Sequence, residues 1–343
     1  MKRIVPYPSL VSEPVQQTRS TVLFNELSTL PFWCGDNHTD QDRFCCLTHV
    51  VGLPRHPATN QQLPLTPYQV DFFQRVNDAK QPKDGMSILE NLRLPHKFHL
   101  LKGRQMGFTE IVLRVIQYYC LHDYAGKKVG IMAATNGALA AKDLRRFARL
   151  FRDIPGVIDT WVKNNKMILA NGTTIEAFKA DQESMTGDTG YKCVMLDEAA
   201  KWRLIDDTPV FNSVMPIVNT NGSDLFLVST PKGRVKMFYN IWKDPQDFNM
   251  LEYDIWRAKD NLYTAEQIQH MIDHSKEDPD QEYLCKFTMG RDAVFPEITD
   301  EMRDENEYEW NYDPENDSFK EPADFRLDDL DDPDFEWRPG RSK

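Results

Sequence analysis

Two adjacent carboxylates, Asp197 and Glu198, directly follow the apolar residues of "CVML". Such a pair can divide two tasks of phosphoryl transfer, because one carboxylate holds Mg²⁺ near the phosphates while the other orients the attacking water. The apolar run has the composition of a buried strand, and ligands of open α/β sheets bind at the carboxyl ends of strands. An acidic pair that begins a solvated loop is the alternative interpretation.

A second stretch, "KGRQMGFT" at residues 102–109, resembles a phosphate-binding loop whose lysine is displaced. The common pattern is G-x-x-x-x-G-K-[ST]. Gly107 and Thr109 fit it, but Phe108 stands where the lysine belongs and Lys102 stands where the first glycine belongs. The loop is therefore either a plain turn from strand to helix or a phosphate site built differently.

The residue types of this loop favour a phosphate site. Gly103 and Gly107 allow backbone N–H groups to approach an anion closely, at the positive end of the following helix. Thr109 supplies a hydroxyl group for Mg²⁺. Because Phe108 cannot neutralise phosphate, the missing cation must be Lys102, with a long and flexible side chain, or Arg104.

The surrounding pattern predicts elements that place these residues together. The apolar run at 98–102 reads as a strand that enters the loop, and helical spacing follows from 109. Asn171 and Gly172 separate two β-like runs, which predicts a hairpin. Further strands are predicted at 128–134, 193–199 and 225–233, and helices at 66–79, 137–151, 208–218, 235–243 and 264–275. Alternating strands and helices indicate an α/β fold with a mostly parallel sheet covered on both faces.

Composition and charge set the broad class of the chain. Its 343 residues, 41% hydrophobic, are enough for one large or two small domains. No stretch approaches about 18 uninterrupted apolar residues, so we expect no membrane span. The six cysteines show no regular disulfide framework, so we expect the protein to reside in a reducing cytosol. The net charge is −12, of which residues 301–343 contribute −10. Binding to nucleic acid would therefore depend on local patches rather than on bulk charge.

These motifs together resemble the ATPase domain of the large terminase subunit, the DNA-packaging motor of tailed bacteriophages and related viruses. Some members carry a deviant loop with lysine first and an aromatic residue before the hydroxyl residue, as in Lys102, Phe108 and Thr109. Others carry an arginine–glutamine pair inside the loop, matched by Arg104 and Gln105, and that arginine is thought to act as an internal arginine finger. The resemblance spans residues 64 to about 295.

The resemblance assigns roles at three further stretches. "PYQVDFF" is similar to the adenine-reading motif, with Tyr68 and Gln69 as the reader residues, although Gln69 also occupies the capping-box position after Thr66. "CVMLDEA" is similar to the strand that ends in the magnesium ligand Asp197 and the catalytic Glu198. "LVSTPKG" is similar to the coupling motif that senses the γ-phosphate. The implied nucleotide-binding residues are Lys102, Gly103, Arg104, Gln105, Met106, Gly107, Phe108, Thr109, Tyr68, Gln69, Ser229 and Thr230; Lys102, Arg104 and Glu198 are catalytic, and Thr109 and Asp197 bind Mg²⁺.

The resemblance also implies a fold, cofactors and partners. The fold is a P-loop NTPase of the RecA-like (ASCE) class, with an irregular N-terminal extension at 1–60, an ATPase core at 61–245, a small subdomain at 246–300 and an acidic, extended or disordered tail at 301–343. The cofactors are ATP and Mg²⁺. The partners are double-stranded DNA, the portal protein and the small terminase subunit. The chain is expected to form a homo-oligomeric ring on the procapsid, in the host cell cytoplasm.

Two other classes of protein are weighed against this one. A superfamily-two helicase shares a glutamine motif and a D-E-A box, but it needs a second motor domain, for which the residues after the coupling motif leave no room. A non-enzymatic nucleotide-binding scaffold is the second alternative, and the sequence does not exclude it. The tail lacks the strand pattern of a nuclease, so we expect nuclease activity on a separate chain or on a longer form of the protein.

Two more clusters could bind ligands. Arg145, Arg149 and Arg152 share a helical face, with Arg146 beside them, which either contacts DNA or a neighbouring subunit or is simply solvated. Five metal-ligand side chains lie within 16 residues: Cys34, His38, Cys45, Cys46 and His49. Because their spacing is not a familiar zinc pattern, we interpret them as buried reduced thiols, with a zinc site as the alternative.

Overall fold

The structure is a computed structural model, and its described residues are 25–35, 45–55, 61–91, 93–133, 137–151, 154, 156–162, 165–183, 185, 190–204, 206–288, 312–313 and 318–319. One compact unit covers residues 1–293 and a second covers 294–343. In the second unit the structure describes a two-residue antiparallel pair, β9 (Tyr312–Asp313) with β10 (Ser318–Phe319).

An eight-stranded sheet forms the centre of the first unit, in the order β3-β4-β5-β2-β6-β7-β1-β8. The strands are β1 (His96–Lys102), β2 (Lys128–Ala133), β3 (Ile158–Val162), β4 (Lys166–Leu169), β5 (Thr174–Phe178), β6 (Tyr191–Asp197), β7 (Asp224–Ser229) and β8 (Phe248–Tyr253). From β5 to β8 every neighbouring pair is parallel, whereas β3, β4 and β5 are joined by antiparallel pairs. The prediction of a mostly parallel sheet is confirmed.

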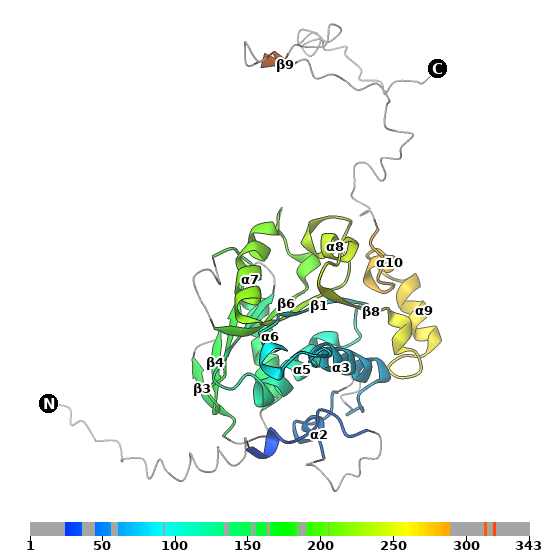
Figure 1. Ribbon diagram of the computed structural model, residues 1–343. Helices are drawn as coiled ribbons and strands as arrows, with labels where there is room; N and C mark the ends of the chain where they lie inside the picture. Colours follow the sequence, from blue (N-terminus) through cyan, green and yellow to red (C-terminus); the bar gives the residue numbers. More distant parts are fainter. Residues whose placement is uncertain are drawn as a thin grey trace, which may run out of the picture. The chain divides into compact units, whose positions relative to one another are not determined.

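Helices cover both faces of this sheet (Figure 1). The helices are α2 (Leu47–Val50), α3 (Pro67–Ala79), α4 (Ile88–Asn91), α5 (Phe108–His122), α6 (Gly137–Arg149), α7 (Thr208–Asn221), α8 (Lys236–Lys243), α9 (Ala265–Asp273) and α10 (Pro279–Glu282). Alternate residues of β6 divide between two cores: Cys193 and Met195 pack in the core that includes α3, α5 and α6, while Val194 and Leu196 pack in the core of α7 and α8. Burial on both faces explains why the central strands read as continuous apolar runs.

Two strands at the ends of the sheet were not predicted from the sequence. β3 pairs antiparallel with β4 at one end, and β8 pairs parallel with β1 at the other. In β8, exposed Asn249 and Glu252 interrupt the apolar residues, as is usual where one side of a strand meets solvent. β8 lies within the stretch expected as a separate subdomain, and it completes the sheet of the ATPase core beside the loop-bearing strand.

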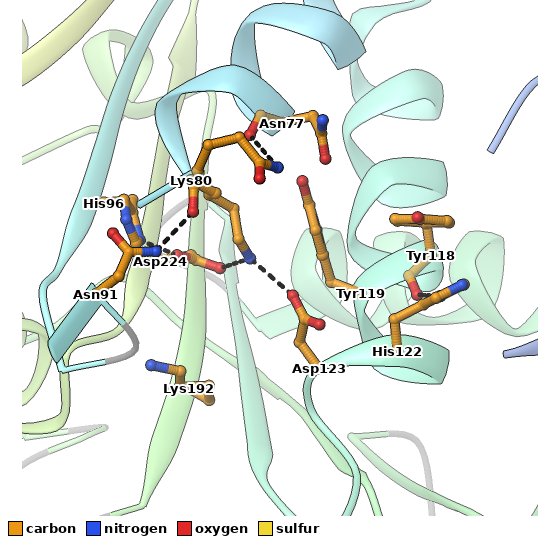
Figure 2. A pocket seen from close by; sticks show the side chains of 11 residues that line it. Asn77, Lys80, Asn91, His96, Tyr118, Tyr119, His122, Asp123, Lys192 and Asp224 are labelled. Atoms are coloured by element: carbon orange, nitrogen blue, oxygen red, sulfur yellow. Dashed lines mark hydrogen bonds and ion pairs between the residues drawn. The ribbon is translucent and has the colours of Figure 1, made fainter. Parts of the chain in front are cut away.

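Charged side chains form a network at the end of the sheet where β1 and β7 begin, which is the end away from the glycine loop that follows β1 (Figure 2). The carboxylate of Asp224 is buried. It lies 2.6 Å from Lys80 Nζ and 3.1 Å from His96 Nδ1, and it accepts a hydrogen bond from the Tyr124 hydroxyl group. A cavity of about 190 Å³ lies beside these side chains. Although burial raises the pKa of Asp224, Lys80 and the hydrogen bonds outweigh burial and hold it at about 2. The network is structural, since it lies at the opposite ends of the strands from Lys102 and Asp197.

No helix in the part of the chain that the structure describes is long and apolar enough to cross a membrane.

Candidate active site

The carboxyl ends of three adjacent strands bring the predicted catalytic residues together. β6 ends at Asp197, β7 at Ser229 and β1 at Lys102, and these parallel strands are neighbours in the order β6-β7-β1. The Lys102 Nζ atom lies 2.7 Å from Glu198 Oε1, with 8% and 38% of the two side chains exposed. Residues that are 96 positions apart in sequence therefore form an ion pair at the place where α/β sheets bind ligands.

The loop between β1 and α5 is held in a conformation that depends on its glycines. The Gly103 N–H donates to the carbonyl of Tyr253 at 2.8 Å, and a Cβ atom at residue 103 would lie 2.9 Å from the carbonyl oxygen of Tyr283. Gly107 caps α5 with φ of 74°, and Gln105 also has positive φ, at 63°. Any side chain at 103 would collide with the backbone of Tyr283 and Ile255, so the loop is packed as well as glycine-rich.

The carboxylate of Asp197 is placed to bind a metal ion. It is 4% exposed, and Oδ2 accepts a hydrogen bond from Thr109 Oγ1 at 3.4 Å. Among the described residues its Oδ1 atom is buried and has no hydrogen-bond partner, and the same holds for Glu198 Oε2. Burial, together with the nearby carboxylates Glu198 and Asp143, raises the pKa of Asp197 to about 8. A divalent cation would satisfy these oxygens, so the donor set fits Mg²⁺.

A third carboxylate, Asp143 of α6, joins the site without having been predicted. Burial, with a smaller contribution from Glu198, raises its pKa to about 6 in spite of Arg146, whose Nη1 atom lies 3.7 Å away. Asp143 lies among buried Ala140 and Phe147 on the inner face of α6. An acid on the apolar face of an amphipathic helix is the sequence signal that could have revealed it.

Arg104 is held beside the site by a buried acid, Glu282 of α10. Arg104 Nη1 lies 3.3 Å from Glu282 Oε2, and Lys201 Nζ lies 2.6 Å from Glu282 Oε1. The Arg104 side chain is 50% exposed and that of Glu282 is 2% exposed. Glu282 therefore fixes two cations at the edge of the site while leaving Arg104 accessible. Because 178 residues separate Arg104 from Glu282, no local sequence pattern predicts this contact.

Tyr68 and Gln69 lie at the start of α3, against the loop. The Tyr68 hydroxyl group donates to the carbonyl of Met106 at 2.9 Å, and burial raises the pKa of Tyr68 to about 12. The Gln69 Oε1 atom accepts from the Thr66 N–H at 3.0 Å, while its Nε2 atom would lie 3.3 Å from a Cβ atom at Gly107. Gln69 caps the helix and also faces the loop; adenine reading by either residue stays a prediction.

Ser229 and Thr230 link the end of β7 to the turn after Glu198. The Ala200 N–H donates to Ser229 Oγ at 3.2 Å, and the buried Thr230 Oγ1 has no hydrogen-bond partner within the described residues. Glu198 itself has a left-handed backbone conformation, with φ of 50°, that non-glycine residues rarely adopt. The turn that carries the catalytic candidate is thus strained and tied to the neighbouring strand.

The structure describes some of the remaining candidate ligand residues and not others. Cys34, Cys45, Cys46 and His49 lie together on the N-terminal segments, whereas His38 is outside the described residues. On α6, Arg145 and Arg149 are exposed. Arg146 is half-buried and paired with Asp143, so it is not part of a free basic face, and Arg152 is outside the described residues.

A mostly parallel sheet, with a glycine loop between β1 and α5 and a carboxylate pair at the end of β6, defines a P-loop NTPase. Residues 99–299 match the family "Terminase large subunit, T4likevirus-type, N-terminal". The chain therefore belongs to this family of large terminase subunits, and the matched residues correspond to the family's N-terminal part.

Several solved structures are similar to this chain at low sequence identity, and one of them, with a TM-score above 0.5, supports the fold. The HK97 bacteriophage large terminase is similar with a TM-score of 0.52 and 14% identity, over 73% of this chain and 56% of that one. The Thermus phage P74-26 large terminase ATPase domain has a TM-score of 0.46 and 17% identity, over 64% of this chain and 98% of that one. The large terminase of a thermophilic bacteriophage, in complex with ADP, has a TM-score of 0.49 and 13% identity, over 65% of this chain and 54% of that one. None of the curated proteins matches the sequence.

Proposed function

We propose that this domain hydrolyses ATP and uses the energy to move double-stranded viral DNA into a procapsid. The observation that carries the proposal is the ion pair of Lys102 with Glu198, 2.7 Å long, at the carboxyl ends of β1 and β6. Lys102 is the first residue of the deviant loop, and it lies close enough to the carboxylate pair for both to act on one phosphate group. The pairing supports a working site with a displaced lysine rather than a broken one.

The residues divide the chemistry between binding and reaction. The N–H groups of the loop at the start of α5 and the ammonium group of Lys102 bind the β- and γ-phosphates. Thr109 and Asp197 hold Mg²⁺, which neutralises charge on the phosphate oxygens. Glu198 orients water for in-line attack, once Lys102 has moved from the carboxylate to the phosphate. Arg104 stabilises the charge that spreads over the equatorial oxygens in the transition state.

The link between β7 and the catalytic turn supports a route from hydrolysis to movement. Ser229 Oγ accepts a hydrogen bond from the Ala200 N–H, two residues after Glu198, and the buried Thr230 hydroxyl group has no hydrogen-bond partner among the described residues. Loss of the γ-phosphate would change the hydrogen bonds of this turn and hence the position of β7. We expect the motor to act as a homo-oligomeric ring at the portal of the procapsid, in the host cytoplasm, with the small terminase subunit and a nuclease.

Release of phosphate from ATP in the presence of Mg²⁺ tests the proposal. Wild type should hydrolyse ATP, while Lys102→Ala and Glu198→Gln should lower the rate by roughly 10³-fold or more, because each loses a group that acts in the transition state. Lys83→Ala, which removes an exposed lysine from the turn between α3 and α4, is the control and should match wild type. A wild-type rate no higher than that of Glu198→Gln would mean a nucleotide-binding scaffold without turnover.

A further inference from the structure

Four metal-ligand side chains converge on the N-terminal segments of the chain. Cys34 lies near the end of the first described segment, Cys45 and Cys46 precede α2, and His49 lies within α2. Their three sulfur atoms and the Nδ1 atom of His49 all lie within 4.8 Å of one another. None of these residues takes part in the nucleotide site described above, so the cluster needs a separate explanation.

The distances within the cluster match a tetrahedron of metal ligands. Cys34 Sγ lies 3.1 Å from Cys45 Sγ, and Cys45 Sγ lies 3.8 Å from Cys46 Sγ. The Nδ1 atom of His49 lies 3.5, 3.2 and 2.9 Å from the sulfur atoms of Cys34, Cys45 and Cys46 respectively. Ligands at normal zinc distances would lie about 3.8 Å apart for two sulfurs and about 3.6 Å apart for sulfur and nitrogen. The observed atoms need to move by less than about 1 Å to reach these values.

Other interpretations of the cluster fit less well. A disulfide bond has a sulfur–sulfur distance of about 2.05 Å, well below the 3.1 Å between Cys34 and Cys45, and none of the described cysteines is in a disulfide bond. Simple hydrophobic burial would bury all three thiol groups, but only Cys46 is fully buried, while Cys34 and Cys45 are partly exposed. Hydrophobic burial also gives no reason for one imidazole nitrogen to face three sulfurs.

We propose that Cys34, Cys45, Cys46 and His49 bind one zinc ion. Thiolate and imidazole are ligands that zinc prefers, whereas Mg²⁺ and Ca²⁺ prefer oxygen ligands. Four protein ligands fill the tetrahedral shell, so this is a structural site and not a second catalytic centre. The indole ring of Trp33 stacks on the His49 ring, with centroids 4.9 Å apart, and holds the imidazole in its ligating orientation.

The position of the zinc site indicates what it stabilises. Phe32, two residues before Cys34, stacks on Phe73 of α3 with centroids 4.0 Å apart and meets Tyr118 of α5 edge-on. After the cluster, the carbonyl of Gly52 accepts a hydrogen bond of 2.9 Å from Arg114 of α5. Both segments that the zinc ion joins therefore contact α3 or α5, and α5 begins at the phosphate loop.

Among the described residues, these two segments contain little regular structure. α2 is only four residues long, which is far below the length at which a helix is stable by itself. Hydrogen bonds join the segments at the carbonyls of Pro31 and Phe32, from the Leu47 N–H at 2.9 Å and from Thr48 Oγ1 at 2.8 Å. A zinc ion would fix the two segments to each other, and so keep Phe32 against the helices that carry the phosphate loop.

Metal analysis of the purified full chain tests the proposal. The protein should be produced in cells supplied with zinc and never exposed to a chelator, and wild type should contain about one zinc ion per chain. Cys34→Ser and Cys46→Ser should reduce the zinc content to near the background, because three ligands bind zinc much more weakly than four. The control, Cys120→Ala, also removes a buried thiol but lies in α5 outside the cluster, and it should retain the zinc ion.

A second measurement applies to wild type alone, so it remains valid if the variants fail to fold. After removal of the native metal, added Co²⁺ should produce the strong visible absorption of a tetrahedral thiolate site, and Zn²⁺ should abolish it. Metal removal should also expose residues 25–55 to limited proteolysis. The proposal is wrong if wild-type protein contains no zinc and gives no cobalt–thiolate absorption, or if it contains iron in place of zinc.

Discussion

Replacing Glu198 with glutamine should tighten the binding of nucleotide although it abolishes hydrolysis. In the nucleotide-free site, Lys102 is held by Glu198 at 2.7 Å, and this pair must break before the lysine can contact phosphate. With 8% and 38% of the two side chains exposed, the pair lies between a buried and a surface ion pair, and we assign it about 1–2 kcal/mol. Since glutamine binds lysine more weakly, nucleotide affinity should increase about 5- to 30-fold.

A titration with a non-hydrolysable ATP analogue in the presence of Mg²⁺ measures this effect without interference from turnover. The matched control is Glu266→Gln, which makes the same change at an exposed acid in the first turn of α9 and should bind as wild type does. In the background of Lys102→Ala, the substitution at Glu198 should no longer tighten binding, because the competing pair is already gone. Unchanged or weaker binding by the Glu198→Gln single variant would refute the exchange of Lys102 between carboxylate and phosphate.

The remaining predictions concern the metal, the arginine and the stability of the sheet. Asp197→Ala should weaken Mg²⁺-dependent nucleotide binding itself, unlike Glu198→Gln; if the two variants behave alike in a binding titration, the division of roles is wrong. Arg104→Ala should lower the turnover number by roughly 10³-fold with little change in nucleotide affinity, and near-normal turnover would exclude it as the arginine finger. Glu282→Gln should also lower turnover, because Arg104 and Lys201 lose their common partner. In the Glu282→Gln background, Arg104→Ala should then lower turnover much less than it does in wild type. Fully additive losses would show that Glu282 does not act through Arg104. Asp224 has a pKa of about 2 when folded against an ordinary value of 3.8, so its charged form stabilises the fold above pH 3.8, and this stability is lost as the pH falls toward 2. The difference in free energy of unfolding between wild type and Asp224→Asn should therefore shrink by about 2 kcal/mol between pH 5 and pH 2, and a constant difference in chemical denaturation would contradict the network.

Local patterns in the sequence predicted the parts of the fold that local physics determines. The apolar run at 98–102 and the glycines after it gave β1 and the loop, and Asn171–Gly172 gave the hairpin of β4 and β5. The alternation of strands and helices then indicated a mostly parallel sheet, whose carboxyl ends bring Lys102 and Glu198 to one edge. The sequence predicted that Lys102 or Arg104 supplies the missing cation; in the structure Lys102 contacts the Glu198 carboxylate and Arg104 contacts Glu282, and which of them acts on phosphate stays a prediction.

Features that depend on contacts distant in sequence were not predicted. Glu282 lies in a four-residue helix with no pattern of its own, and only the folded chain brings it to Arg104. β8 was missed because polar residues at the edge of the sheet break its apolar pattern. The sequence left the cysteine and histidine cluster open between buried thiols and a zinc site, because its spacing along the chain is irregular and its side chains meet only after α2 and Trp33 are packed.

The most direct test of the central claim is the initial rate of phosphate release from ATP and Mg²⁺, measured with and without double-stranded DNA. A packaging motor should couple its site to DNA, so we expect wild type to hydrolyse ATP and to do so faster when DNA is added. Glu198→Gln should show neither the basal nor the stimulated rate. A wild-type rate equal to that of Glu198→Gln under both conditions would contradict the account.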